Sequence, residues 1–242
     1  MLRQLESRKS CRAYEEKSVP EEIKKAIMQS ALEAPTAGNM TLYTILDITD
    51  EELKQKLSVS CDNQPFIAKA PVVLIFCADY YRWYKVFCDN VEEVRKPAEG
   101  DFLLAQADAL IAAQNVVVAA ESFGLGSCYI GDITENFELH REMLNLPDYV
   151  VPSCMLCIGY PAGSQIRRQK PPRFALDDIV HENGYDINKA DRMEEMLMKK
   201  QGYEDKESFT HWLKNFCQRK WNSDFSREMS RSVKTMIERF CK

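Results

Sequence analysis

The stretch from Ala105 to Ile133 most constrains what this chain can fold into. Its first two thirds hold small and apolar residues with almost no charge, so we expect a helix that is buried nearly all round. Gly124 stands where a helix C-cap is expected, and Gly126 follows it. The segment 128–133 then has the pattern of a turn or a short strand edge that another group can approach closely. Taken alone, the stretch fits either an ordinary core helix or a helix that presents a glycine-bearing backbone to a flat ligand.

The composition is that of an ordinary globular protein. The 242 residues are 45% hydrophobic and 29% charged, so the chain can bury a substantial core. A formal net charge of -5 argues against a general nucleic-acid binder, because no strongly basic face is implied. The apolar segment 111–120 is shorter than the roughly 18 residues that cross a membrane. The N-terminus lacks the apolar core of a secretory signal, so we expect a cytoplasmic protein with neither nucleic-acid nor membrane partners.

The nine cysteines indicate neither disulfides nor a metal site. Their number is odd and their spacings are mostly long, which is a poor disulfide framework in a reducing cytosol. Cys154 and Cys157 form a C-x-x-C, but they lie in a stretch typical of a buried strand. Side chains three residues apart on a strand point to opposite faces and cannot chelate one ion. We therefore expect core cysteines and no bound metal.

Hydrophobic periodicity predicts strands that alternate with helices, which favours a single α+β or α/β domain with a helical C-terminal excursion. The segment 79–94 is aromatic and charged and is expected to form a helix or a lid near the functional site. Strands are predicted at 42–46, 70–77 and 150–159, and helices at 20–34, 50–59, 102–123, 140–144, 192–200, 209–220 and 225–240.

A cationic cluster lies near the N-terminus. The spacing Arg8-x-Ser10-x-Arg12 places alternate side chains on one side of an extended or turning segment. Two guanidinium groups and a hydroxyl that converge in this way form a good receptor for a phosphate dianion. The alternative is a basic patch that is merely solvated.

Taken in order, these motifs resemble those of the nitroreductase/flavin reductase family of FMN enzymes. The resemblance covers residues 1–185 continuously, and the C-terminal helices look most like the NADPH-preferring, oxygen-insensitive subgroup. It implies an α+β nitroreductase-like fold, with a central mixed, mainly antiparallel sheet flanked by helices. It also implies an FMN-binding core at 1–185, a helical extension of the same domain at 186–242, and a homodimer whose interface holds FMN between both chains. The matching segments are 8–14, Val19-Pro20, 34–39, Asn63-Gln64, 119–126, 129–132, Gly159-Tyr160-Pro161 and 170–173.

The resemblance also implies which residues hold the cofactor. The cationic cluster would bind the FMN phosphate, with Arg8 where relatives often carry His and Lys9 where they often carry Arg. Thr41 stands where many relatives carry Gln, and either Lys170 or Arg173 matches a Lys-Pro-Arg pattern that is lengthened here by one proline. The implied cofactor-binding residues are Arg8, Lys9, Ser10, Arg12, Asn39, Thr41, Gln64, Tyr129, Ile130, Gly131, Asp132, Lys170 and Arg173. By position only, Arg219, Lys220 and Arg227 are candidates for the 2′-phosphate of NADPH, or else solvated helix faces.

The implied activity is that of an oxidoreductase that moves two electrons from NADPH or NADH to nitroaromatics, quinones or flavins by a ping-pong mechanism. The flavin carries the chemistry in such an enzyme, so no catalytic side chain is expected. A flavin reductase that supplies reduced FMN to a partner would use the same residues. An FMN-binding redox sensor without turnover, and a helical interaction protein with a solvated basic N-terminus, are the alternatives from other classes.

Overall fold

The computed structural model describes residues 2–241, and the chain divides into two compact units. The first unit holds the chain up to Arg168 together with the segment that begins at Glu228, and the second is the segment 169–227. The predicted functional core therefore lies almost entirely in the first unit.

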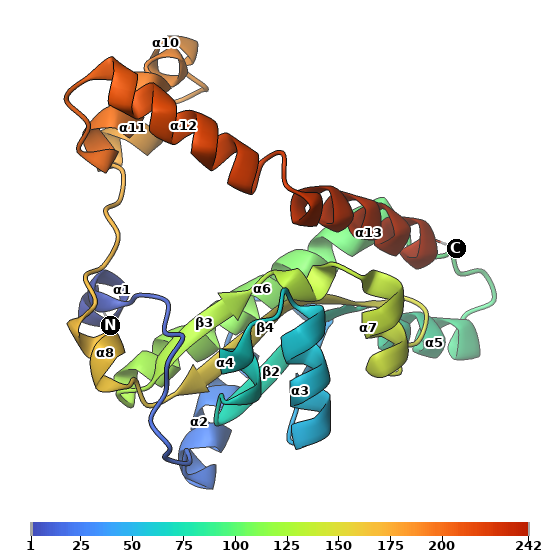
Figure 1. The fold of residues 1–242 in the computed structure, drawn as a ribbon. Helices are drawn as coiled ribbons and strands as arrows, with labels where there is room; N and C mark the ends of the chain where they lie inside the picture. The colour runs from blue at the N-terminus through green and yellow to red at the C-terminus, as the bar shows by residue number, and fades with distance from the viewer. Residues whose placement is uncertain (1, 242) are drawn as a thin grey trace. The chain divides into compact units, whose positions relative to one another are not determined.

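A four-stranded antiparallel sheet forms the centre of the first unit (Figure 1). Its strands follow the order β1-β2-β4-β3, so β2 and β4 are the inner strands. Both inner strands are buried at every position, which explains why their sequences are continuous apolar runs. The predicted α+β class is confirmed, and β4 has the predicted bounds. The strands are β1 (Tyr43–Asp47), β2 (Val72–Asp79), β3 (Gly126–Ile130) and β4 (Val150–Gly159).

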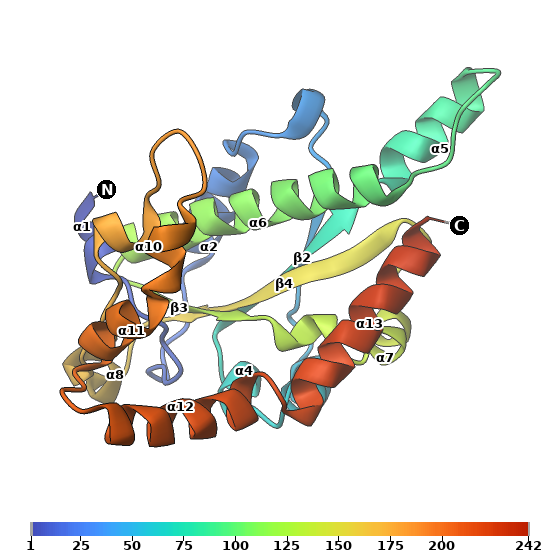
Figure 2. The same cartoon turned by 90° about the horizontal axis from the view of Figure 1, so that it is seen from above.

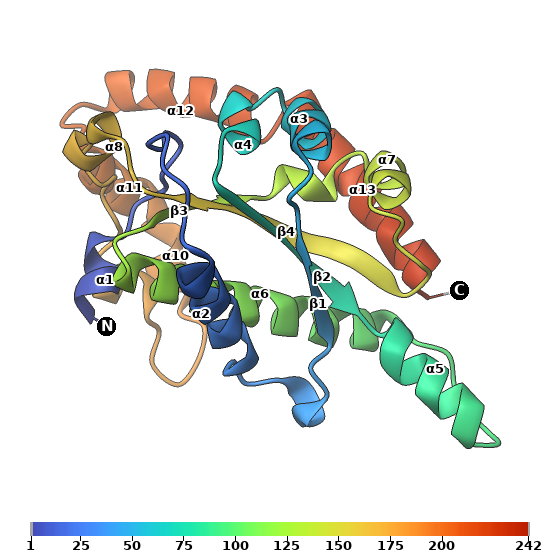
Figure 3. The ribbon, with the colours of Figure 1, turned by 90° about the horizontal axis from the view of Figure 1, so that it is seen from below.

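Helices cover both faces of this sheet (Figures 2 and 3). One face packs against α2 (Glu21–Leu32) and α6 (Glu99–Ser122), and the other against α3 (Glu51–Ser60) and α4 (Pro65–Ala68). Cys154 belongs to the first of these two core layers and Cys157 to the second, as the strand geometry predicted. All nine cysteines are free thiols, and six of them are buried, which confirms the core expectation for those six.

Helix α6 ends as predicted but is less buried than predicted. Gly124 adopts a left-handed φ of 74° and terminates the helix. One face of α6 is exposed in the single chain, so burial nearly all round is wrong: Leu103, Leu104, Leu110 and Ile111 are 67%, 48%, 44% and 41% exposed. By length and composition α6 could also cross a membrane, which the shorter run 111–120 did not suggest. Helix α6 packs against the sheet, as a core helix does. It also carries two buried aspartates that accept hydrogen bonds, which is further evidence for a core helix.

The remaining helices complete the two units. The aromatic segment after β2 forms a helix, α5, and a short N-terminal helix, α1, was not predicted. The first unit also contains α1 (Leu2–Ser7), η1 (Ala37–Asn39), α5 (Tyr81–Asn90), η2 (Asp132–Thr134), α7 (Phe137–Met143) and α8 (Gly163–Arg167). The second contains α9 (Leu176–Ile179), α10 (Ile187–Asp191), α11 (Met193–Gln201) and α12 (Lys206–Lys220), and α13 (Asp224–Phe240) begins in the second unit and ends in the first.

Candidate functional site

The N-terminal segment lies against the outer edge of β3. The Cys11 N–H donates a hydrogen bond of 2.8 Å to the Ser127 carbonyl oxygen. Glycine is required at position 126, because a Cβ there would lie 2.8 Å from the Cβ of Cys11. The segment continues past the end of β4, where the Glu15 N–H donates to the Tyr160 carbonyl oxygen at 2.9 Å. The structure therefore brings the cationic cluster to the glycine-bearing strand, although the two are more than a hundred residues apart in sequence.

The three residues of the predicted phosphate receptor lie close enough to Cys128 in β3 to influence its pKa. Burial raises the pKa of the Cys128 thiol, while the guanidinium groups of Arg12 and Arg8 and a hydrogen bond with Ser10 act in the opposite direction. Arg8 Nη1 is buried and has no hydrogen-bond partner within residues 2–241. A buried guanidinium N–H without an acceptor is uncommon in folded proteins and calls for an anionic partner. The cluster therefore fits a phosphate group.

Lys9, by contrast, has a structural partner. Its Nζ donates to the carbonyl oxygens of Ile166, at 2.9 Å, and Arg168. These carbonyls belong to the C-terminal end of α8, where a cation satisfies acceptors that the helix leaves free. The side chain of Gln165 in the same helix accepts a 2.9 Å hydrogen bond from the Arg12 N–H. Helix α8 thus anchors the cationic segment, a role that the sequence analysis did not assign.

Gln64 and Asp132 are joined directly. Gln64 Nε2 donates to Asp132 Oδ2 at 2.9 Å and to the Cys61 carbonyl oxygen at 3.0 Å. The neighbouring Gly131 is exposed, and a Cβ built on it meets no atom within 4 Å. The segment before α4 and the turn after β3 therefore form one polar surface whose backbone is open to a ligand.

Tyr129 and Ile130 direct their side chains into the protein. The Tyr129 hydroxyl donates to Gln114 Oε1 of α6 at 3.2 Å, and burial raises the pKa of this hydroxyl. Ile130 is buried in the core layer on the opposite face of the sheet. At both positions only the backbone is left to contact a cofactor.

Asn39 and Thr41 lie on a separate loop that Asp108 of α6 organises. The buried Asp108 carboxylate accepts hydrogen bonds from the Thr36 hydroxyl, from the Ala37 N–H at 3.0 Å and from the Leu42 N–H at 3.2 Å. Asn39 and Thr41 both adopt left-handed φ angles, 58° and 52°. Their hydrogen bonds stay within this loop and with Arg82, so one chain does not join them to the cationic cluster. Asp108 was not among the predicted residues, although an acid within an otherwise apolar stretch of helix signals such a role.

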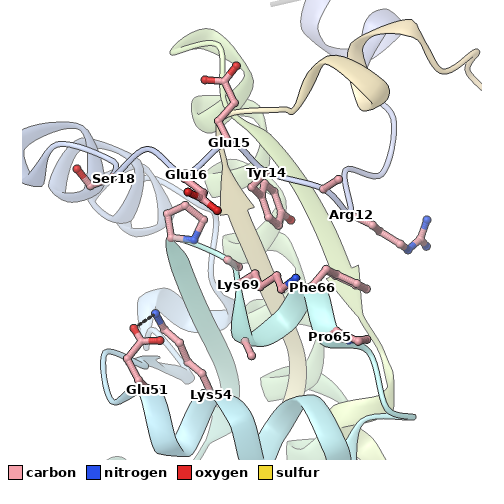
Figure 4. Close-up of a pocket in the computed structure, with 14 residues that line it drawn as sticks. Arg12, Tyr14, Glu15, Glu16, Ser18, Glu51, Lys54, Pro65, Phe66 and Lys69 are labelled. Carbon is pink, nitrogen blue, oxygen red and sulfur yellow. Dashed lines mark hydrogen bonds and ion pairs between the residues drawn. The ribbon is translucent and has the colours of Figure 1, made fainter.

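A groove of about 840 Å³ continues from the cationic cluster along the same side of the unit (Figure 4). Arg12 and Tyr14 form one wall, and Pro65, Phe66 and Lys69 form another. Tyr14 is fixed in place because its hydroxyl donates to the carbonyl oxygens of Cys11 and Cys157, at 2.8 and 2.9 Å. The groove offers both aromatic rings and cations next to the predicted phosphate receptor.

The one buried histidine belongs to a structural network. His140 is fully buried, with Nδ1 3.0 Å from the Ile133 carbonyl oxygen and Nε2 2.8 Å from Ser60 Oγ. Burial lowers the pKa of His140, so the ring is neutral, with Nδ1–H as donor and Nε2 as acceptor. This histidine has no access to a substrate.

The other predicted ligands belong to the second unit. Lys170 and Arg173 lie at its beginning, in the basic, proline-containing loop. Each of the three predicted nicotinamide-phosphate residues contacts a neighbour in sequence. The Arg219 guanidinium lies 5.6 Å from the Phe216 ring centre, Lys220 Nζ lies 5.1 Å from that of Phe225, and Arg227 lies 3.7 Å from Asp224.

Comparison with known proteins gives consistent matches. A family model described as "Nitroreductase family" matches residues 5–160. The chain is 35% identical over 185 residues to an FMN reductase (NADPH) of Bacillus subtilis, covering 76% of this chain and 73% of that protein. It is 30% identical over 242 residues to a second B. subtilis protein, FMN reductase (NAD(P)H), covering 99% and 91%. Among solved structures, the NfrA1 nitroreductase of B. subtilis superposes with a TM-score of 0.77 at 28% identity, covering 96% of this chain and 97% of that one.

Proposed function

Because this chain belongs to the nitroreductase family, we infer that it is an FMN-dependent oxidoreductase that takes electrons from NAD(P)H. The fold is nitroreductase-like, as predicted. The observation that carries the inference is the convergence of Arg8, Ser10 and Arg12 on β3, with a buried guanidinium N–H of Arg8 that lacks an acceptor. Arg8, Ser10 and Arg12 bind the FMN phosphate, and Gln64, Gly131 and Asp132 face the flavin ring.

Bound FMN supplies the two-electron transfer between NAD(P)H and an acceptor, and the protein supplies binding, orientation and electrostatics. Backbone groups at Tyr129, Ile130 and Gly131 can approach a flat ring closely, because the two larger side chains point away from it. Fixed donors and nearby cations stabilise negative charge that develops on such a ring. The acceptors are nitroaromatics, quinones or free flavin, which alternate with NAD(P)H in a ping-pong cycle. The names of the relatives favour the flavin reductase as the second candidate function.

The active form is a homodimer with FMN at its interface. The exposed apolar face of α6, with Leu103, Leu104, Leu110 and Ile111, supports this assembly, because contiguous exposed apolar surface of this kind marks an interface. Within residues 2–241, Asn39 and Thr41 have no hydrogen bond to the cationic cluster of their own chain, which supports their contribution to the partner's site.

The remaining predicted ligands lie beyond Arg168 in the chain. Either Lys170 or Arg173 contacts FMN, and Arg219, Lys220 and Arg227 bind the 2′-phosphate of NADPH. Residues 1–185 form the FMN-binding core and 186–242 its helical extension. Nine free thiols support a cytoplasmic protein. The net charge of -5 supports small molecules rather than nucleic acid as its partners.

FMN binding to an Arg12→Ala variant tests the proposal. One charge-assisted hydrogen bond to a phosphate is worth about 1.5–3 kcal/mol, so the dissociation constant should rise roughly 10- to 150-fold. The measurement is quenching of flavin fluorescence as the apoprotein is titrated into FMN. Lys25→Ala, which removes an exposed cation paired with Glu21, is the control and should leave the affinity unchanged.

Two results would contradict the proposal. Unchanged FMN affinity in Arg12→Ala removes the phosphate assignment. A purified wild-type protein that is colourless, takes up no FMN and oxidises neither NADPH nor NADH with any acceptor removes the function itself.

A further inference from the structure

Three carboxylates from two segments meet beside the Gln64–Asp132 hydrogen bond. One ligand oxygen from each of Asp62, Asp132 and Glu135 lies within 4.8 Å of the other two. Asp62 is exposed, Asp132 is half-buried and Glu135 is only 2% exposed. The loop after α3 supplies the first, and η2 and the residue that follows it supply the others. The cluster is therefore open to solvent on the Asp62 side and closed on the Glu135 side.

Glu135 has no partner that compensates for its burial. Its Oε1 is fully buried and has no hydrogen-bond partner within residues 2–241. Burial, together with the neighbouring charges of Asp62, Asp132 and Glu228, raises the pKa of Glu135 to about 7. Arg231 already forms an ion pair with Glu228 at 2.8 Å, so it does not neutralise Glu135. Burying a carboxylate among like charges is costly unless a cation neutralises the group.

We propose that Asp62, Asp132 and Glu135 bind a hard divalent cation. Carboxylate oxygens are the ligands that Ca²⁺, Mg²⁺ and Mn²⁺ prefer, and the set contains no sulfur or nitrogen that would select zinc. Three carboxylate oxygens within 4.8 Å of one another are close enough to share one such ion. Water completes the coordination shell on the exposed Asp62 side.

The cation site shares a residue with the proposed flavin surface. Asp132 accepts the hydrogen bond of Gln64 through Oδ2, so an ion that fixes the Asp132 carboxylate also fixes Gln64. The ion acts as a positioning element and takes no part in electron transfer. Cation binding itself depends only on the three carboxylates, so it stands or falls independently of FMN chemistry.

The test is Mn²⁺ binding to the full-length, FMN-loaded protein after treatment with a chelator, followed by electron paramagnetic resonance. We expect one Mn²⁺ per chain with a dissociation constant of about 10⁻⁴ M or tighter, displaced by Ca²⁺. Asp62→Asn and Glu135→Gln should each weaken binding by about tenfold or more. Asp89→Asn, which removes an exposed carboxylate that pairs with Lys85, is the matched control and should bind as the wild type does.

The proposal is overturned if the wild type binds no Mn²⁺ at about 1 mM, because Glu135 is then simply a protonated acid. It is equally overturned if Asp62→Asn binds Mn²⁺ as tightly as the wild type. Asp62 is exposed on a loop, so this variant decides the matter even if Glu135→Gln fails to fold. Loss of FMN binding with Mn²⁺ binding retained would count against the proposed function and leave the cation site standing.

Discussion

Replacing Asp108 by asparagine tests whether this buried carboxylate shapes the loop that carries Asn39 and Thr41. The carboxylate accepts from one hydroxyl and two backbone N–H groups, and it is only 3% exposed. An asparagine can keep its oxygen toward the Thr36 hydroxyl and the Leu42 N–H. Its amide nitrogen then faces the Ala37 N–H. The Ala37 N–H loses the oxygen that accepted its hydrogen bond, and two N–H donors face each other.

The expected cost follows from that single lost interaction. A hydrogen bond to a charged group contributes about 1.5–3 kcal/mol, and a buried donor left without an acceptor costs a similar amount. We expect Asp108→Asn to lower the free energy of unfolding by about 2–3 kcal/mol, which is roughly 4–12 °C in Tm for a chain of this length. Thr36→Val keeps the shape but removes both the donor to Asp108 and the acceptor of the Thr41 N–H, so it should cost about 1–3 kcal/mol.

Equilibrium urea denaturation followed by tryptophan fluorescence measures these free energies, with Asp89→Asn as a control for the loss of a carboxylate on the surface. A free energy of unfolding for Asp108→Asn within about 0.5 kcal/mol of the wild type would show that the carboxylate does not stabilise this loop, because ordinary surface substitutions change the free energy of unfolding by that amount.

Three further predictions follow from other contacts. Gly126→Ala places a methyl group 2.8 Å from the Cβ of Cys11, so it should cost about 1–3 kcal/mol and expose the N-terminal segment to limited proteolysis, whereas Gly100→Ala meets no atom and should not. Leu110→Asp puts a charge on the exposed face of α6 and should convert a dimer into a monomer in analytical ultracentrifugation, with unchanged circular dichroism. Arg231 holds the pKa values of Glu138 and Glu228 at about 2, below their usual range, so its stabilisation is complete above about pH 4.5 and is lost as the pH falls towards 2. The difference in Tm between wild type and Arg231→Met should therefore narrow over that interval, and a constant difference would contradict the assignment.

Much of the fold follows from local pattern. The bounds of β4 are those predicted, because a strand buried on both faces is mostly apolar along its whole length. The glycine stop of α6 is equally local, since the left-handed φ of Gly124 suits glycine far better than other residues. The candidate site could be predicted only in part. The spacing of Arg8, Ser10 and Arg12 predicted that they form one cluster, and the structure adds that this cluster lies beside β3.

Other features depend on contacts that no local pattern encodes. Leu110 in α6 is as apolar as a core leucine, and only the lack of a neighbour makes it exposed. Lys9 lies in the same cationic run as Arg8, yet α8, some 157 residues further along the chain, takes up its charge. Glu135 stands in an ordinary polar turn, and it is buried in the structure near Asp62 and Glu228, which are distant from it in sequence.

The hydrogen bond between the Cys11 N–H and the Ser127 carbonyl oxygen also bears on how the sheet avoids edge-to-edge aggregation. β3 is the last strand of the sheet, so its outward peptide groups would otherwise be open to any passing extended chain. The N-terminal segment covers part of this edge of β3, in addition to carrying the proposed phosphate-binding residues. A chain cleaved before Tyr14 would therefore lose the proposed phosphate receptor and expose the edge of β3, so we expect it to aggregate as well as to lose affinity for FMN.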